Sequence, residues 1–150
     1  MNQAPVKLSI IIPHHKGEAL LYKCLQSLHN TSYSNYEIIV VDNNSKDQSI
    51  LKSKKEFPEI KVLSLDQNLG YAGGCNKGAL EAQGELLLFL NNDTIHENNW
   101  IEPLVDMMDN YKDIGSIQPK IKNINNNDRF DYAGGSGGFL DIFCFPFSRG

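Results

Sequence analysis

The sequence predicts an α/β fold, in which a mostly parallel, open sheet carries helices on both faces. Two observations support this prediction. Segments typical of strands alternate four times with segments of helical periodicity. The strand segments are apolar along most of their length, which is typical of parallel strands buried on both faces. Because crossovers between parallel strands are right-handed, few topologies remain, and one of them has the strand order 3-2-1-4.

The first three elements form one β-α-β unit. Residues 8–12 predict a buried strand that ends at Pro13, because proline has no N–H to offer a sheet. A second buried strand is predicted over 36–41, and the polar cluster 42–45 that follows it can turn the chain and cap a helix. Between the two strands, apolar residues recur with helical spacing at Leu21, Cys24, Leu25 and Leu28.

The remaining elements continue the alternation as far as Lys120, and beyond it the alternation ends. The asparagine-rich stretch 123–128 predicts a solvated loop, and the stretch 131–150, rich in glycine and aromatic residues, predicts a loop that packs against a partner. Before Lys120 we expect a helix over 47–57, a strand over 60–65, a glycine-bearing loop over 68–74, a helix over 75–82, a strand over 85–90, a helix with its apolar stripe at Ile101, Leu104, Val105 and Met108, and a fifth strand over 114–117.

Composition and charge exclude several function classes. The 150 residues suit one compact domain, and 14 basic against 18 acidic residues give a net charge of −4, which argues against nucleic-acid binding. The apolar runs hold about five residues, whereas a membrane span needs ~20, and the first residues show no secretory signal. Cys24, Cys75 and Cys144 fit neither a disulfide framework nor a metal site, so we expect reduced thiols in a cytoplasmic protein.

Polar side chains follow each of the four expected strands at its carboxyl end. They are His14 and His15 after the first strand, Asp42 after the second, the 68–76 loop after the third and Asn91–Asp93 after the fourth. In an open parallel sheet, ligands bind at this edge, where the strand order reverses. If the strand order is 3-2-1-4, the reversal brings His14, His15 and Asp93 to one crevice, and a ligand site is expected there.

A nucleotide in this crevice would have to be held without the usual phosphate-binding loops. The turn after the first strand reads Pro-His-His-Lys-Gly, so it lacks the Gly-x-Gly-x-x-Gly fingerprint of dinucleotide-binding domains, and the sequence contains no P-loop. The altered turn disfavours a NAD-dependent enzyme. A divalent cation at Asp93 would supply the counter-charge that a diphosphate needs.

Four motifs occur in order: the first strand with its Pro13, Val40–Ser45 (VVDNNS), Asn68–Gly78 (NLGYAGGCNKG) and Leu88–Thr94 (LFLNNDT). Over about residues 7–120, this set resembles family 2 glycosyltransferases, in particular their bacterial rhamnosyltransferase-like members. The resemblance implies the Rossmann-like GT-A fold with the strand order 3-2-1-4, in which residues 1–120 form the half that binds a nucleotide-sugar. Residues 121–150 would begin the acceptor-side region, which the chain would hold only in part.

The resemblance also implies a role for each strand end. Asp42 would hydrogen-bond the base of a nucleotide-diphospho-sugar, and Asp93 would bind Mg²⁺ or Mn²⁺ that bridges the diphosphate. Where family members have a first carboxylate in the metal motif, this sequence has an asparagine, so we expect weak metal affinity without the nucleotide. The remaining nucleotide-sugar contacts are expected at Pro13, His14 and His15, which form one wall, at Asn68, Gly73, Gly74 and Asn76 of the closing loop, and at Asn91 and Asn92.

The implied activity is inverting transfer of a hexosyl or rhamnosyl group to a glycan or glycolipid acceptor, in cell-surface polysaccharide synthesis. The general base would be a carboxylate from an acidic motif after the metal motif, but no such motif is found, and spacing singles out neither Asp131 nor Asp141. We therefore expect donor binding without efficient transfer. The alternative is a non-catalytic nucleotide-binding or protein-interaction module of flavodoxin-like form. The sugar, the base, the acceptor, the oligomeric state and peripheral membrane association of a longer protein stay open.

Overall fold

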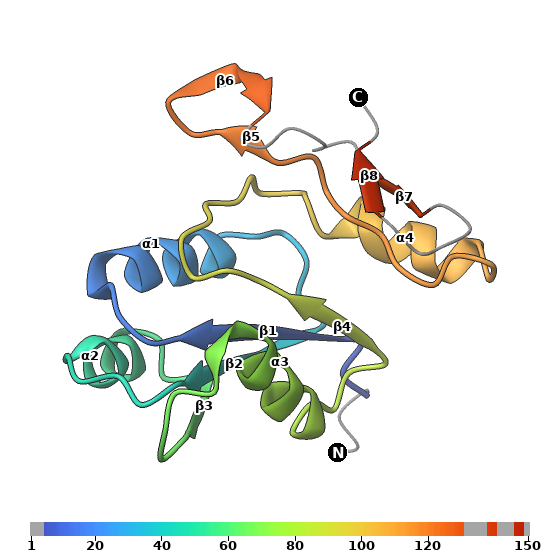
Figure 1. Cartoon of the computed structure of the whole chain (residues 1–150). Helices are drawn as coiled ribbons and strands as arrows, with labels where there is room; N and C mark the ends of the chain where they lie inside the picture. Colours follow the sequence, from blue (N-terminus) through green and yellow to red (C-terminus); the bar gives the residue numbers. More distant parts are fainter. Residues whose placement is uncertain (1–4, 131–137, 141–145, 149–150) are drawn as a thin grey trace. The chain divides into compact units, whose positions relative to one another are not determined.

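The computed structural model describes residues 5–130, 138–140 and 146–148, with side chains up to residue 126 (Figure 1). Contacts divide the chain into two compact units, Met1–Asn99 and Trp100–Gly150. The first unit contains all the strand ends that the sequence singles out. No helix in the described part of the chain is both long and apolar enough to cross a membrane.

The first unit is built on a four-stranded sheet in the order β3-β2-β1-β4. Every neighbouring pair in it is parallel, so the predicted strand order and the predicted α/β class are confirmed. The strands are β1 (Leu8–His14), β2 (Tyr36–Asp42), β3 (Lys61–Ser64) and β4 (Leu86–Phe89).

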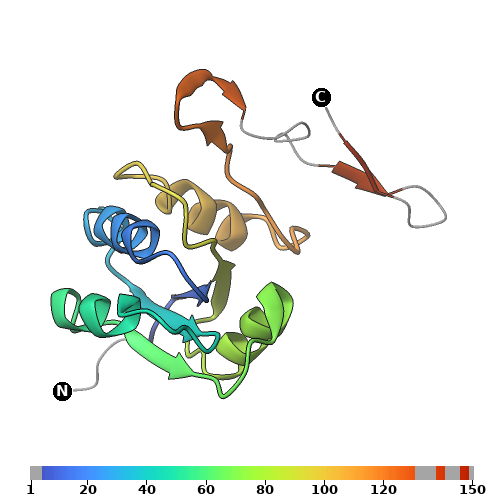
Figure 2. The same cartoon turned by 60° about the vertical axis from the view of Figure 1, so that its left-hand side comes forward.

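Helices cover both faces of this sheet (Figure 2). α1 (Glu18–His29) and α2 (Ser49–Glu56) contact each other on one face, and α3 (Gly70–Leu80) packs against β1 and β2 on the other. The predicted α1 stripe is confirmed, since burial of these apolar side chains against the sheet is what favours the helix. The buried stripe residues are Leu21, Cys24, Leu25 and Leu28.

The first strand is longer than predicted, because Pro13 lies within β1 instead of ending it. Successive residues of a parallel strand turn their backbone groups to alternate neighbours. The backbone groups of Ile11 face β4, since the Ile11 carbonyl accepts from the N–H of Leu90, the residue after that strand, at 2.9 Å. Pro13 is two residues further along, so its backbone faces the same side. β4 ends at Phe89, before the level of Pro13, so the missing N–H costs no sheet hydrogen bond. The strand therefore continues to His14.

The third helix begins at Gly70, not at Cys75 as predicted. Gly73 and Gly74, expected in a loop, therefore lie inside α3. Glycine disfavours a helix interior by about 1 kcal/mol, which is why the sequence indicated a loop here. The helix forms because its glycines let it lie close to the sheet.

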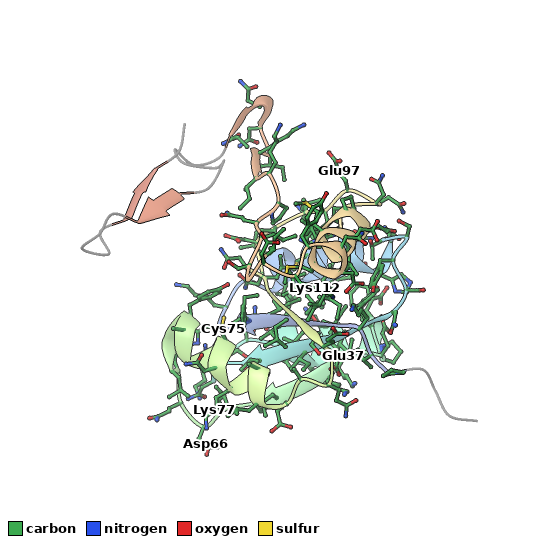
Figure 3. The ribbon with its side chains drawn as sticks, turned by 90° about the vertical axis from the view of Figure 1, so that its right-hand side faces the viewer. Glu37, Asp66, Cys75, Lys77, Glu97 and Lys112 are labelled. Carbon is green, nitrogen blue, oxygen red and sulfur yellow. The ribbon has the colours of Figure 1, made fainter. Side chains whose placement is uncertain are left out.

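Two glycines of α3 one turn apart, Gly74 and Gly78, show this close approach. A Cβ on Gly74 would lie 3.0 Å from Cβ of Pro13, and a Cβ on Gly78 would lie 3.0 Å from Cγ2 of Val41. Such distances are tighter than most real Cβ contacts, so only glycine fits at Gly78 without movement of the core. In the same helix Lys77 is exposed, as Figure 3 shows.

The sheet is less completely covered at β4 than predicted. Leu87 and Phe89 are 44% and 46% exposed. Phe89 pairs with Ile11, whose side chain packs in the cluster under α3, so the exposed residues face the same side of the sheet as α3. That helix lies over β1 and β2, which leaves this side of β4 open.

The second unit holds α4 (Glu102–Asn110), which confirms the predicted helix there, with Ile101 and Val105 buried. Residues 114–117 form no strand, contrary to the prediction, because the run is short and Gly115 interrupts it. The expected solvated loop at 123–128 is also corrected. β5 (Lys122–Asn123) and β6 (Asn126–Phe130) form an antiparallel hairpin whose turn is stabilised by the Asn125 N–H, which donates to Asn123 Oδ1 at 2.9 Å.

Within the stretch 131–150, β7 (Gly138–Leu140) and β8 (Pro146–Ser148) pair as antiparallel strands, so the prediction of a loop is wrong for these segments. The carboxylates Asp131 and Asp141 and the thiol Cys144 lie outside the described residues.

Candidate functional site

The four strand ends meet at one edge of the sheet, and hydrogen bonds join the segments that follow them. The Asn43 N–H after β2 donates to the carbonyl of His14 at the end of β1, at 2.7 Å. The Asn44 side chain donates to the carbonyl of Asp66 after β3, at 2.8 Å. On the other side of β1, the side-chain amide of Asn92 after β4 lies 2.8 Å from the His14 ring. The structure thus brings together the strand-end segments that the sequence singled out.

The two histidines after the first strand differ in exposure. His14 is 1% exposed, and its ring contacts Asn92 through Nδ1 and Ser49 through Nε2. Burial lowers the pKa of His14, although the nearby Asp47 and Asp42 carboxylates raise it in part. His15 is exposed, and its Nδ1 donates to the carbonyl of Asn43 at 3.0 Å. Only the second histidine can therefore present a ring face to a ligand.

Asp42 lies half-buried at the end of β2, where its side chain also shapes the backbone. Its Oδ1 accepts from the Ser45 N–H at 2.8 Å, which closes the turn after the strand. Among the described residues, Oδ2 has no hydrogen-bond partner, so one oxygen of the carboxylate is available to a ligand.

Asn43 joins several segments of the candidate site, although in the sequence it is only one residue of the Val40–Ser45 motif. It is 3% exposed, and its side chain donates to the carbonyl of Gly70 at 2.9 Å and accepts from the Leu69 N–H at 3.1 Å. Its backbone bonds to His14 and His15. An amide can donate and accept at once, which explains an asparagine at a position that must join β1, β2 and the start of α3. An amide directly after a buried strand was the available signal.

The segment before and within α3 holds four of the predicted contacts. Asn68 Oδ1 accepts from the Gly70 N–H at 2.8 Å and so fixes the start of the helix. Gly73 is half-buried, Gly74 is packed under Pro13, and Asn76 is exposed on the helix surface. Pro13 itself is buried.

The segment after β4 holds the candidate metal ligand. Asp93 is exposed, and its carboxylate has no hydrogen bond or ion pair with the described residues. Asn91 is also exposed, and its carbonyl accepts from the Thr94 hydroxyl at 2.9 Å. Within residues 5–126, no group of three or more histidine, cysteine or acidic side chains could hold a metal ion by itself.

A cavity of about 480 Å³ lies beside α1 and contains none of the predicted site residues. His96 on its wall contacts Ser27 Oγ through Nδ1 at 2.8 Å and Thr94 Oγ1 through Nε2 at 3.1 Å. Burial lowers the pKa of His96 to about 4. The lining residues are Lys23, Gln26, Ser27, Asn30, Ile95, His96 and Asn98.

Replacing His96 with asparagine is expected to reduce the loss of folding stability as the pH falls below neutral. The pKa of His96 lies at about 4 in the folded chain against an ordinary value of 6.5. Between these pH values the unfolded chain binds more protons, so stability falls as the pH falls. Urea unfolding at several pH values in this range should show that the free energy of unfolding has a smaller slope against pH in His96→Asn than in the wild type. The exposed His29 gives the control, because His29→Asn should keep the full slope. Equal slopes in the wild type and both variants would contradict a buried His96.

Two cysteines behave as predicted. Cys24 and Cys75 are free and buried, and burial raises the pKa of Cys24 to about 12. Burial also raises the pKa of Cys75, so both remain protonated thiols at neutral pH.

Comparison with known proteins identifies the family and agrees with the fold. The family model described as glycosyl transferase family 2 matches residues 9–142. An uncharacterized glycosyltransferase of Haemophilus influenzae is 31% identical over 126 residues, which cover 84% of this chain and 42% of that protein. A GalNAc(5)-diNAcBac-PP-undecaprenol beta-1,3-glucosyltransferase of Campylobacter jejuni is 38% identical over 92 residues, which cover 58% of this chain and 29% of that protein. The chain thus spans less than half the length of these relatives.

Among solved structures, TarS of S. aureus in complex with UDP-GlcNAc superposes with a TM-score of 0.65 at 24% identity, over 78% of this chain and 38% of that one. TarS in complex with UDP gives a TM-score of 0.63 at 24% identity. At this identity the similarity establishes the fold, and it agrees with the GT-A arrangement that the sequence indicated. With the family model matching most of its length, the chain belongs to glycosyl transferase family 2.

Proposed function

We propose that this chain is the donor-binding part of an inverting glycosyltransferase, which takes a nucleotide-diphospho-sugar at the carboxyl edge of its sheet and works in the cytoplasm. One observation supports this most directly. The contacts of Asn43 and of Asn92 with the end of β1 gather an exposed ring, His15, and two carboxylates with free oxygens, Asp42 and Asp93, on segments that adjoin one another. A flat ring and a carboxylate suit a nucleobase, and a second carboxylate can hold the cation that neutralises the diphosphate.

The roles follow from exposure and bonding. His15 would stack on the base, and Oδ2 of Asp42 would accept from it. The segment from Asn68 to Asn76 would close over the nucleotide, with Asn68 holding the start of α3 in place. His14 is too deeply buried to contact a nucleotide through either ring nitrogen, so we assign it a different part below.

The residues present fit a divalent cation that binds together with the donor. Mg²⁺ is commonly held by one or two carboxylates plus substrate phosphates, and Mn²⁺ also prefers oxygen ligands. Asp93 supplies one exposed carboxylate, and Asn91 and Asn92 beside it are neutral. We therefore propose that Asp93 holds Mg²⁺ or Mn²⁺ only when the diphosphate supplies further oxygens. Such an ion would stabilise the negative charge of the leaving nucleoside diphosphate.

In the proposed reaction, an acceptor hydroxyl attacks the anomeric carbon, the bond to the diphosphate breaks, and the hydroxyl proton passes to a carboxylate base outside the site described here. We propose a glycan or glycolipid acceptor in cell-surface polysaccharide synthesis and a hexosyl or rhamnosyl donor. The names of two relatives support the proposed acceptor class. The Campylobacter jejuni relative is named for an undecaprenol-linked substrate, and a Bacillus spizizenii relative, which is 36% identical over 94 residues, is named for poly(ribitol-phosphate).

Calorimetric titration with UDP, dTDP and GDP, each with and without Mn²⁺, tests donor binding. We expect one of the three to bind, and to bind more tightly with Mn²⁺, because the chain lacks a phosphate-binding loop and depends on a cation for counter-charge. NAD⁺ serves as the control and should not bind. If the chain is folded by circular dichroism and binds none of the three nucleotides, the proposed function is wrong.

A further inference from the structure

Four polar side chains form a continuous hydrogen-bonded connection from the start of α2 to the segment after β4. We call it the His14 bridge, and it consists of Asp47, Ser49, His14 and Asn92. Asp47 Oδ1 contacts Ser49 Oγ, Ser49 Oγ lies 2.7 Å from His14 Nε2, and His14 Nδ1 lies 2.8 Å from Asn92 Nδ2. The connection spans elements that are far apart in the sequence.

Only one arrangement of protons satisfies every member of the His14 bridge. The Asp47 carboxylate can only accept, so the Ser49 hydroxyl donates to it. Ser49 Oγ must then accept from His14, which places the ring proton on Nε2. His14 Nδ1 is therefore an acceptor, and the Asn92 amide donates to it. The same amide lies 3.3 Å from the carbonyl of Lys16, a second acceptor, which agrees with this orientation.

Both ends of the bridge have further contacts of their own. Asp47 accepts from the Ser49 N–H at 3.0 Å and from the Gly17 N–H at 3.3 Å, which ties it to the start of α1. These bonds keep the pKa of Asp47 low, so it is an anion at neutral pH. At the other end, β4 stops at Phe89, and the side-chain amide of Asn92 links the segment after it to β1.

Histidine suits this place for a physical reason. Its two nitrogens lie on opposite sides of a rigid ring, so one side chain can bond to two elements at once. Burial of a ring with an unpaired nitrogen would be costly, and here both nitrogens are paired. His15 next to it points away into solvent, as adjacent residues leaving a strand do.

We propose that His14 is a positioning residue, which through Asn92 holds the segment carrying Asp93 in the orientation that binds the donor diphosphate. The proposal rests on the proposed function, because it concerns the same site. It differs from the sequence expectation, in which His14 contacts the nucleotide itself. In a bridge of this kind, the carbonyl oxygen of Asn92 stays available, because only its NH₂ group is used.

Titration of UDP with and without Mn²⁺ tests the proposal on three variants. His14→Phe keeps the volume of the ring and removes both nitrogens, so we expect Mn²⁺-dependent affinity to fall about tenfold, as for loss of groups that orient a metal ligand. Affinity for UDP without Mn²⁺ should stay as in the wild type. His14→Asn places an acceptor near the position of Nδ1 and should restore much of the loss. His29→Phe, at an exposed histidine on α1, is the matched control and should bind as the wild type does.

The outcomes separate positioning from general damage. If His14→Phe is folded and its affinity for UDP equals that of the wild type both with and without Mn²⁺, the proposal is overturned. It is also overturned if both affinities fall together and His14→Asn restores neither, since His14 would then only support the fold. If His14→Phe does not fold, the comparison of His14→Asn with the wild type and the measurement below decide.

Nitrogen NMR of the imidazole ring gives a second readout that needs no nucleotide. We expect His14 to be neutral with its proton on Nε2, and the side-chain amide signals of Asn92 to shift in His14→Phe but not in His29→Phe. A proton on Nδ1 would overturn the His14 bridge while leaving donor binding intact. Conversely, a wild type with the expected tautomer that binds no nucleoside diphosphate would reject the proposed function and, with it, the role of the bridge in donor binding.

Discussion

Asp93→Ala is expected to remove the Mn²⁺-dependent part of nucleotide binding. Asp93 is the first carboxylate after β4, and it is exposed with no hydrogen-bond or ion-pair partner among the described residues. Loss of groups that merely orient a metal ligand costs about 10–100-fold in metal affinity, so loss of the carboxylate should cost at least that much. Tenfold corresponds to ~1.4 kcal/mol, which calorimetry resolves easily. Affinity measured without Mn²⁺ should change little or rise slightly, because a negative charge near the diphosphate is removed.

The matched control for this substitution is Glu97→Ala. Glu97 is exposed on the same segment, as Figure 3 shows, and its replacement changes the net charge by the same amount. We expect it to bind UDP with Mn²⁺ as the wild type does. A folded Asp93→Ala that keeps the full Mn²⁺ effect would show that the cation, if it binds, is held elsewhere. That result would favour a nucleotide-binding module without the metal chemistry of a transferase.

The parallel α/β class could be predicted from features that the sequence shows directly, whereas the strand order came from the family resemblance. The second strand, for example, is apolar over residues 38–41, which is typical of a sheet covered on both faces. Right-handed crossovers then leave few arrangements. Because the strands are parallel, the polar residues that follow them, such as Asp42 and Asp93, come to one edge. The class of the sheet and the approximate place of the candidate site therefore followed from local patterns.

The errors have physical causes that single residues reveal. Pro13 continues β1 because its neighbour β4 has already ended, and that depends on the length of a different strand. Gly73 and Gly74 are helical because close packing on the sheet outweighs their poor helix propensity. The hairpin at 122–130 depends on an asparagine turn that looks like any solvated loop in the sequence. For Pro13 and the glycines, tertiary contacts outweighed the local preference.

The site itself was predicted less well than the sheet. His14 and His15 look alike in the sequence, yet one is buried and bonded through both nitrogens and the other is exposed. Strand alternation shows that the two side chains point apart, but not which of them meets Asn92. Asn43 was missed for a similar reason, since its partners at residues 69 and 70 come from a separate segment. Hydrogen-bond partners across elements become visible only in three dimensions.

Gly78→Val is expected to destabilise the fold by about 3 kcal/mol, since overpacking of a tight core costs ~1–3 kcal/mol and here the new Cβ already overlaps core atoms. A Cβ at Gly78 meets Cγ2 of Ile11 and lies 3.0 Å from Cγ2 of Val41, and both side chains are fully buried. Valine would add two further carbons at this contact. Urea unfolding followed by circular dichroism should show the loss as a lower midpoint with an unchanged slope.

Gly78→Ala tests whether core packing or helix propensity has the larger effect on the free energy of unfolding. In a helix interior alanine is favoured over glycine by about 1 kcal/mol, so an uncrowded site would be stabilised. We expect a net loss instead, because the new methyl group meets Ile11 and Val41 before the surrounding core can relax. Lys77→Val, at the exposed neighbouring position, controls for the helix propensity of valine and should cost only ~0.5 kcal/mol.

A stabilised Gly78→Ala would mean that α3 does not lie as close to β1 and β2 as the structure shows. The start of the helix would then be free to move, and with it the bonds from Asn43 to residues 69 and 70. A net loss at Gly78 with little change at Lys77 would instead show that the closeness of α3 to the sheet is real. Since the same helix holds residues 69 and 70 against Asn43, its packing decides whether the proposed donor site can form before any ligand arrives.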